Sequence, residues 1–164
     1  MPVAYLAGGC FWGVQAYYDR VDGVTGTVTG FAQSRIEHPT GGQIASGAAG
    51  AVETVAVTFD EQTVSLKTLF RLHLLLVEET PVTSDAPPSE LPGVFWTDRS
   101  QRCVVESVLR DHPIPNLRVE ELTAFEPSSQ EQQHYLAAHP GAECHVPLTL
   151  LSSVREWQKR LERA

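Results

Sequence analysis

Short segments of the chain alternate between apolar and polar side chains, the pattern typical of β-strands with one buried face. The clearest example is residues 52–59, where the odd-numbered positions from Glu53 to Phe59 would share one face of a sheet. Short apolar runs bounded by glycine predict further strands. The predicted strands are residues 3–8, 24–31, 52–59, 93–97 and 117–125.

Other segments place apolar residues at the three- and four-residue spacing of a helix. The predicted helices are residues 10–21, 65–77, 101–110 and a C-terminal helix that begins near Ser153. Ser153 and Glu156 fit a capping box at that point. The segments 34–50 and 78–92 are rich in Gly, Ser or Pro and have neither period, which predicts two long loops.

In chain order these elements read β-α-β-β-α-β-α-β. The first six match the split βαβ arrangement of ferredoxin-like folds, in which a mixed, mostly antiparallel sheet carries helices on one face. We therefore predict the α+β class, as a two-layer sandwich followed by a C-terminal tail and helix. The length of 164 residues predicts a single domain, 1–164, with a core at 3–126 and a tail at 127–164.

Composition narrows the classes of function. The chain is 42% hydrophobic and 20% charged, which is typical of a folded globular protein. Its net charge of −8 opposes binding to nucleic acid or anionic lipid. It has no apolar run of about 18 residues and no signal peptide pattern, so we expect neither a membrane span nor export. Three cysteines, an odd and sparse set, favour a reducing, cytoplasmic location over a disulfide-bridged secreted fold.

Cys10 is the first candidate for chemistry. It follows a predicted strand and a Gly8–Gly9 turn, at the start of a predicted helix. Backbone N–H groups there lack intrahelical partners, and the positive end of the helix dipole favours a thiolate. The position predicts a nucleophilic cysteine with a lowered pKa. Taken alone, it equally fits a small buried side chain where a strand meets a helix.

Residues 9–13, Gly-Cys-Phe-Trp-Gly, resemble the G-C-F-W-G signature of the A-type peptide methionine sulfoxide reductases, which reduce the S epimer of methionine sulfoxide. The resemblance implies that Cys10 is the nucleophile. Aromatic rings suit the S-methyl group of such a substrate, because they offer an apolar, polarisable surface. Phe11 and Trp12 would then form the pocket for the methyl group.

The likeness covers residues 5–70 well and residues 94–144 more loosely. Within it, residues 30–60 follow the family's G-Y-T-G-G…P-T and S-G…G-H-A-E…V-x-V-T-F-D motifs, which implies that Glu53 is the catalytic acid. A carboxyl group kept neutral by apolar neighbours can protonate the sulfoxide oxygen while a thiolate attacks the sulfur. Without the family, an acidic residue in an alternating strand would be assigned to a solvated face.

Two tyrosine hydroxyls that hold the substrate oxygen in the family are missing. Phe31 stands in place of the first, and the region of the second reads Asp-Ala-Pro-Pro-Ser-Glu, where Asp85 would match the family's aspartate and Glu90 would replace the tyrosine. Loss of one preorganised donor typically slows catalysis by ~10²–10³. Another group would have to compensate: the candidates are Glu90, Tyr17, Tyr18 and Tyr135.

The polar tail resembles the family as well. Its Gln-Gln-His-Tyr-Leu stretch is similar to the family's H-Q-Q-Y-L, which places Tyr135 near the substrate and precedes a recycling cysteine. The resemblance implies that Cys144 condenses with the sulfenic acid left on Cys10. Thioredoxin or another dithiol reductant would then open the disulfide, so no cofactor is expected.

Several hypotheses remain open from the sequence. Cys103, beside an apolar helix stripe, is expected to be structural. The spacing of His134, His139, Cys144 and His145 fits a zinc site poorly. The same thiol cycle could act on another sulfoxide or a selenoxide, since the tyrosines are missing. An alternative from a different class is a non-catalytic thiol sensor, in which Cys10 is oxidised without turnover.

Overall fold

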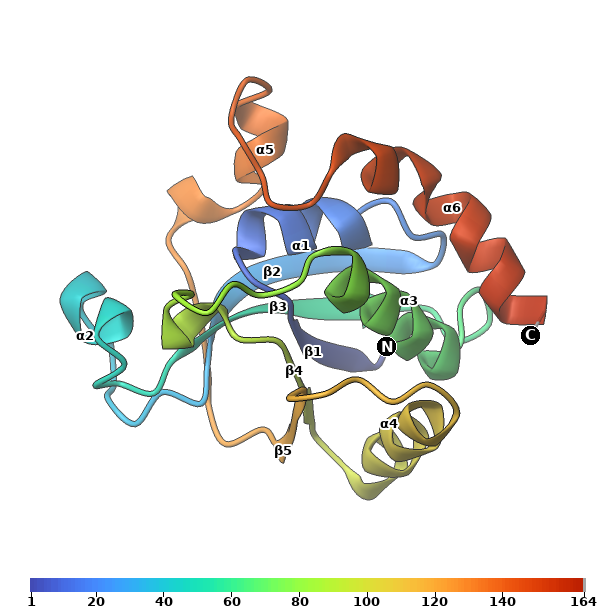
Figure 1. Cartoon of the computed structure of the whole chain (residues 1–164), viewed down its shortest axis with the longest axis horizontal. Helices are drawn as coiled ribbons and strands as arrows, with labels where there is room; N and C mark the ends of the chain where they lie inside the picture. Colours follow the sequence, from blue (N-terminus) through green and yellow to red (C-terminus); the bar gives the residue numbers. More distant parts are fainter. Residues whose placement is uncertain (164) are drawn as a thin grey trace.

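The chain folds around one curved six-stranded sheet (Figure 1). The computed structural model describes residues 1–163. The strands, in spatial order β5-β4-β1-β3-β2-β6, are β1 (Val3–Ala7), β2 (Val24–Ala32), β3 (Val52–Phe59), β4 (Gly93–Trp96), β5 (Arg118–Glu121) and β6 (Phe125–Pro127). Neighbouring strands are antiparallel, except for the parallel pair β4 and β5.

Helices connect these strands or follow them in the tail. They are α1 (Phe11–Tyr18), α2 (Gly41–Ala45), α3 (Leu66–Glu79), α4 (Arg99–Asp111), α5 (Tyr135–Ala138) and α6 (Leu148–Arg163), with 3-10 turns η1 (Pro88–Glu90) and η2 (Gln130–Gln132). Helix α1 joins β1 to β2 around β3, and α3 joins β3 to β4 around β1. This is the split βαβ arrangement, so the predicted α+β class is confirmed.

The core between sheet and helices includes an unusual buried histidine, His73 of α3. The Tyr18 hydroxyl donates to its Nδ1 at 2.6 Å, and its Nε2 donates to the Ala7 carbonyl at 2.8 Å. A carbonyl oxygen can only accept, which fixes this tautomer. Burial lowers the pKa of His73 to about 4, so the ring is neutral. The network anchors the end of β1, immediately before the Gly8–Gly9 turn.

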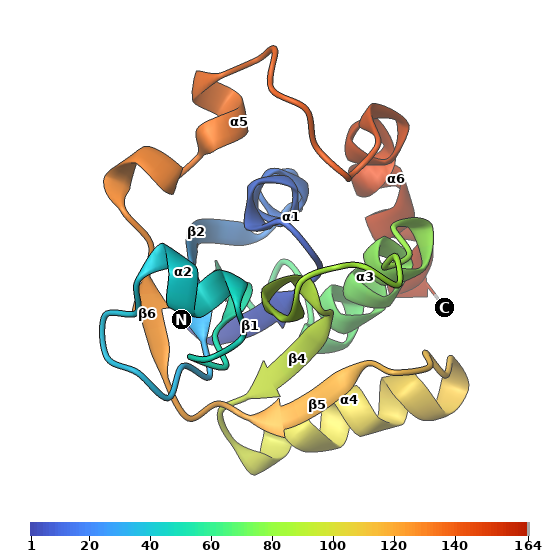
Figure 2. The ribbon, with the colours of Figure 1, turned by 60° about the vertical axis from the view of Figure 1, so that its left-hand side comes forward.

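The strand predicted at residues 117–125 is wrong as a single strand. It divides into β5 and β6, which lie at opposite edges of the sheet (Figure 2). In a flat sheet those edges would be ~24 Å apart, whereas the four steps from Glu121 to Phe125 span ~14 Å at most. The sheet must therefore curl until its edges approach. Gln33 supports the crossing, because its side chain accepts from Thr123 N and donates to the Glu121 carbonyl, both at 2.8 Å.

The C-terminal helix begins earlier than predicted. Helix α6 starts at Leu148, and the Pro147 carbonyl accepts its first hydrogen bonds. Ser153 therefore lies inside the helix, where its hydroxyl donates to the Thr149 carbonyl at 2.9 Å and caps nothing. Figure 1 shows α6 running alongside α1 and α3. None of the helices within residues 1–163 has the length and apolarity needed to cross a bilayer.

The two predicted loops contain short helices that local hydrogen bonds stabilise. In α2, the Thr40 hydroxyl accepts from Gln43 N, and the Gln43 side chain accepts from Thr40 N, which together form a capping box. The segment after α3 carries η1, which brings Glu90 back toward β3. These loops frame the end of the sheet where β1 meets α1.

Candidate active site

The turn between β1 and α1 presents Cys10 at the start of the helix. Gly9 adopts a φ of +94°, which strongly favours glycine, and Cys10 is the N-cap residue of α1 with φ −54° and ψ 123°. The next backbone N–H, that of Phe11, donates to Glu53 Oε1 at 3.3 Å. One free donor of the first helical turn thus meets the carboxyl group of Glu53 beside a half-buried thiol.

Glu53 lies on the helix-facing side of β3, directly opposite Phe31 of β2 in the sheet register. It is not on a solvated face. Burial raises the pKa of its carboxyl group to about 7, and the nearby Glu90 carboxylate adds to the effect, while the Phe11 N–H opposes it. The expectation of a carboxyl kept neutral by burial is confirmed in direction. Glu90 thus acts on Glu53 in the same direction as burial and favours the protonated form of the Glu53 carboxyl group.

The pKa predicted for Cys10 is wrong in sign. Burial raises the pKa of the thiol to about 12, and the negative charges of Glu53, Cys144 and Glu90 act in the same direction. The backbone N–H of Trp12 lowers it, as expected at a helix start, but by less than burial raises it. Desolvation penalises the thiolate more than one helix turn stabilises it. The resting form of Cys10 is therefore the thiol.

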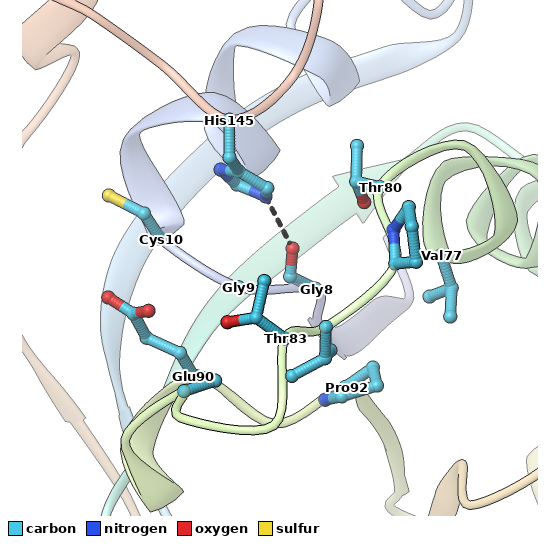
Figure 3. Close-up of a pocket in the computed structure, with 12 residues that line it drawn as sticks. Gly8, Gly9, Cys10, Val77, Thr80, Thr83, Glu90, Pro92 and His145 are labelled. Carbon is cyan, nitrogen blue, oxygen red and sulfur yellow. Dashed lines mark hydrogen bonds between the residues drawn. The ribbon is translucent and has the colours of Figure 1, made fainter.

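Cys10 opens onto a cavity of about 180 Å³ at this end of the sheet (Figure 3). Its walls come from the β1–α1 turn, the end of α3, the loop through η1 and the tail. The polar side chains that line it, besides the Cys10 thiol, are Thr80, Thr83, Glu90 and His145. Val77, Val82, Ala86 and two prolines make the rest of its wall apolar.

The predicted aromatic residues separate into two pairs outside the lining of this cavity. Phe11 is 5% exposed and packs on Phe31, with ring centroids 5.4 Å apart. Trp12 instead stacks on Tyr135 of the tail, with centroids 3.7 Å apart, and its indole N–H donates to the Gln132 side chain at 2.7 Å. The first pair lies beside Glu53, and the second holds the tail against α1.

Two tyrosines considered as replacement donors cannot take that position. The Tyr17 hydroxyl donates to the Leu72 carbonyl at 2.7 Å, and the Tyr18 hydroxyl is bound to His73. Both side chains are 0% exposed, in the core between α1 and α3. Asp85 lies outside the cavity lining and is fully exposed, and a hydrogen bond from Thr83 lowers the pKa of its carboxyl group. Of the acids predicted in this loop, the structure brings Glu90 to the site.

The tail places Cys144 one helical turn from Cys10. A Cβ at Gly13 would collide with Cys144 Sγ and lie 2.8 Å from Val146, so only glycine permits this packing. Gly13 and Cys10 are three residues apart, which puts them on one side of α1. Cys144 is half-buried, and burial raises the pKa of its thiol. The second glycine of the G-C-F-W-G segment thus makes room for the tail.

Sequence reasoning missed how the glutamines of the tail act. Gln133 binds the backbone of Thr29 through both ends of its amide, accepting from N at 2.9 Å and donating to the carbonyl at 3.0 Å. It thereby continues the hydrogen bonding of β2. With Gln132 on Trp12, it fixes the start of the tail on the core. The polar, Gln-rich composition was the signal that could have indicated such docking.

Other cysteine and histidine residues lie apart from this arrangement. Cys103 is exposed on α4, although it was expected to be structural. His134 contacts Asp19, and His139 stacks on Tyr135. No group of three or more His, Cys, Asp or Glu side chains within residues 1–163 is arranged to hold a metal ion.

A thiol at a helix start, a buried acid with a pKa near 7 and a second thiol one turn away together define a thiol-dependent oxidoreductase. A sequence model of the family "Peptide methionine sulfoxide reductase" matches residues 2–162. The chain therefore belongs to the peptide methionine sulfoxide reductase family.

Named relatives agree with this assignment. Peptide methionine sulfoxide reductase MsrA of Alkaliphilus metalliredigens is 28% identical over 92% of this chain and its own full length. Methionine sulfoxide reductase A of Corynebacterium diphtheriae has a similar fold, with a TM-score of 0.72 at 20% identity over 88% of this chain and 82% of that chain. Mxr1 from Saccharomyces cerevisiae, solved in complex with Trx2, matches with a TM-score of 0.51 at 17% identity, over 82% and 84% of the two chains.

Proposed function

We propose that this protein reduces the S epimer of methionine sulfoxide, free or in peptides, at Cys10. The observation that carries the proposal is the convergence of Cys10 and the Glu53 carboxyl on the first turn of α1, where the Phe11 N–H binds Glu53. This places a nucleophile that lines the cavity next to an acid whose pKa is raised to about 7. Sulfoxide reduction requires that pair, since the sulfur is attacked while the oxygen takes up a proton.

In the first step, the Cys10 sulfur loses its proton and bonds to the sulfoxide sulfur as Glu53 protonates the oxygen. Transfer of the hydroxyl group to Cys10 releases methionine and leaves a sulfenic acid, so the cysteine is oxidised by two electrons and the sulfoxide is reduced by two. Glu90 takes the place of a tyrosine hydroxyl in this proposal, because it lines the cavity and acts on Glu53. The Phe11–Phe31 pair supplies the apolar wall beside the acid.

In the second step, the Cys144 thiol loses its proton and its sulfur attacks the Cys10 sulfur, and the hydroxide that leaves takes up that proton to form water. Its place one helical turn away supports this assignment, as does the docking of the tail through Trp12 and Tyr135. A dithiol reductant then opens the disulfide. Thioredoxin is the proposed reductant, which the complex of the yeast relative Mxr1 with Trx2 supports.

The same proposal treats the chain as a single domain, with the catalytic core at 3–126 and a resolving tail at 127–164. Contacts from the tail to α1 and β2 support one unit. It also places the protein in the cytoplasm, since an odd and sparse set of three cysteines fits a reducing environment.

Steady-state turnover of separate S and R sulfoxide substrates, recycled by thioredoxin, tests the proposal. Turnover of the S epimer that disappears in Cys10→Ser supports it, with Cys103→Ser as the matched control that should retain activity. Turnover confined to other sulfoxides or to selenoxides would contradict the proposal that methionine sulfoxide is the substrate. Oxidation of Cys10 without any turnover would identify a thiol sensor.

A further inference from the structure

A histidine that the proposed cycle does not use shares the cavity of Cys10. His145 follows Cys144, and its Nε2 lies 2.7 Å from the Gly8 carbonyl oxygen (Figure 3). A Cβ at Gly9 would lie 2.7 Å from the same nitrogen. The imidazole therefore packs directly on the backbone that leads into Cys10.

The tail segment 144–146 sends its side chains to two sides. Cys144 and Val146 line a cleft between α1, α5 and α6, whereas His145 lines the cavity with Cys10. His145 therefore shares the cavity of Cys10, whereas Cys144 lies on the other side of the same segment.

The hydrogen bond to Gly8 decides which ring nitrogen is basic. A carbonyl oxygen only accepts, so Nε2 carries the hydrogen and Nδ1 of the neutral ring keeps its lone pair. Figure 3 shows the second ring nitrogen on the side of the ring toward Cys10, whose sulfur is directed away from the ring, so the thiol must rotate about its Cα–Cβ bond to meet this nitrogen. A neutral imidazole oriented by a third group beside a cysteine is the arrangement that activates thiol nucleophiles.

The proposed chemistry needs such a base. Glu53 must keep its proton for the sulfoxide oxygen, and Glu90 acts on Glu53 to raise its pKa. The titratable groups lining the cavity are Cys10, Glu90 and His145. Because Glu90 acts on the acid, His145 is the group left to take up the proton of the thiol.

We propose that His145 Nδ1 accepts the proton of Cys10 when its sulfur attacks the sulfoxide, an inference that rests on the function proposed above. The S–H bond breaks toward the imidazole, the sulfur–sulfur bond to the substrate forms, and the proton of Glu53 goes to the oxygen. The imidazolium then returns its proton through solvent to the Glu53 carboxylate. Protons and electrons balance with the sulfoxide as the oxidant.

The test uses the full chain with Cys103→Ser and Cys144→Ser, which leaves Cys10 as the single thiol. His145→Gln keeps an amide donor for the Gly8 carbonyl but has no base, whereas His145→Ala removes both. We expect each substitution to slow alkylation of Cys10 by iodoacetamide and single-turnover methionine formation, by about tenfold or more. Added imidazole should restore much of both rates in His145→Ala.

Three results would overturn the inference. Rates in His145→Gln equal to those of the parent would show that no base is needed there. Slowing in His145→Ala alone, without rescue by imidazole, would show that the ring only packs on the turn. If both rates fall in Glu90→Gln and neither falls in His145→Gln, the base is Glu90. Because alkylation needs no sulfoxide, a parent that alkylates but forms no methionine contradicts only the proposed function.

Discussion

At the scale of single residues, the site is a competition between burial and the backbone. The start of α1 favours a thiolate at Cys10, yet burial near two carboxyl groups raises its pKa to about 12. The same burial keeps Glu53 protonated up to a pH of about 7. The same burial therefore keeps a proton on Glu53 and also on Cys10, so Cys10 needs a proton acceptor before it can act as a nucleophile.

The first prediction concerns the proton on Glu53. Glu53→Gln should slow single-turnover methionine formation by about 10²-fold or more, since general acid catalysis is lost. In the parent, a plot of log rate against pH should change slope near pH 7, where Glu53 loses its proton. The variant should show no such change. A variant that retained both the rate and the break would remove the general-acid assignment.

The second prediction links the same residue to stability. The pKa of Glu53 rises from an ordinary 4.5 to about 7 on folding. Between these values the unfolded chain has released the proton and the folded chain has not, so the free energy of unfolding falls as pH rises through that window. The shift corresponds to roughly 3 kcal/mol. Below about pH 4.5, where both states are protonated, this contribution is fully retained.

Above about pH 7, the free energy of unfolding of Glu53→Gln should therefore exceed that of the parent by up to roughly 3 kcal/mol, measured by urea unfolding. The difference should disappear near pH 4.5. The amide keeps an acceptor for the Phe11 N–H, so the comparison isolates the charge. Glu61→Gln, on the exposed surface, is the control and should show no pH-dependent difference. Equal pH dependence in parent and Glu53→Gln would contradict the raised pKa.

Only some of the site residues and their properties could be predicted from the sequence. Cys10 and Glu53 were identified through the family's motifs, and the structure brings them together. The sign of the Cys10 pKa was missed, because the depth of burial depends on the loop through Glu90 and on the tail. His145 was considered only for zinc, although its place after Cys144 was visible.

At the scale of elements, the tail packs closely against the first turn of α1 because Gly13 has no side chain. Gly13→Ala would drive a Cβ into Cys144 Sγ and close to Val146. Alanine is the better helix former, so the helix itself should not be weakened. We expect formation of the Cys10–Cys144 disulfide to slow by about 10- to 100-fold, because small displacements of reacting groups are costly.

To measure that rate, one equivalent of sulfoxide is added, samples are quenched by alkylation at successive times, and mass spectrometry gives the fraction of protein with the disulfide. Gly41→Ala is the matched control, since a Cβ at Gly41 meets nothing within 4 Å. An unchanged disulfide rate in Gly13→Ala would show that the tail does not need this packing.

Helix and strand positions were largely predictable where the apolar period is strong, as in β3 and α3. The errors have a common physical source. The capping box predicted at Ser153 does not form, because α6 begins more than one turn earlier, where the Pro147 carbonyl accepts the first hydrogen bonds. The alternation at 117–125 was real, but it served two strands in place of one.

At the scale of the whole molecule, the curl of the sheet brings its two edges within reach of three connecting residues. No local pattern reports such closure, since it depends on the pairing of β5 with β4 and of β6 with β2. Gln33, with a φ of +64°, joins β2 to this crossing through its side chain. The closure carries the chain from β5 round to β6 and on to the tail.

Gln33→Ala should lower the free energy of unfolding by about 2 kcal/mol, because hydrogen bonds to Thr123 and Glu121 are lost together. Gln33→Gly removes the same bonds but relieves the left-handed backbone, so it should be less damaging than alanine. Urea unfolding measures both. Midpoints equal to that of the parent would show that the crossing does not depend on Gln33.

The account as a whole is tested most directly by one single-turnover measurement. The reduced chain receives one equivalent of the S sulfoxide without any reductant, and mass spectrometry follows both protein and product. We predict one equivalent of methionine and a disulfide between Cys10 and Cys144. A chain that forms no methionine, or that links Cys10 to Cys103, would contradict it.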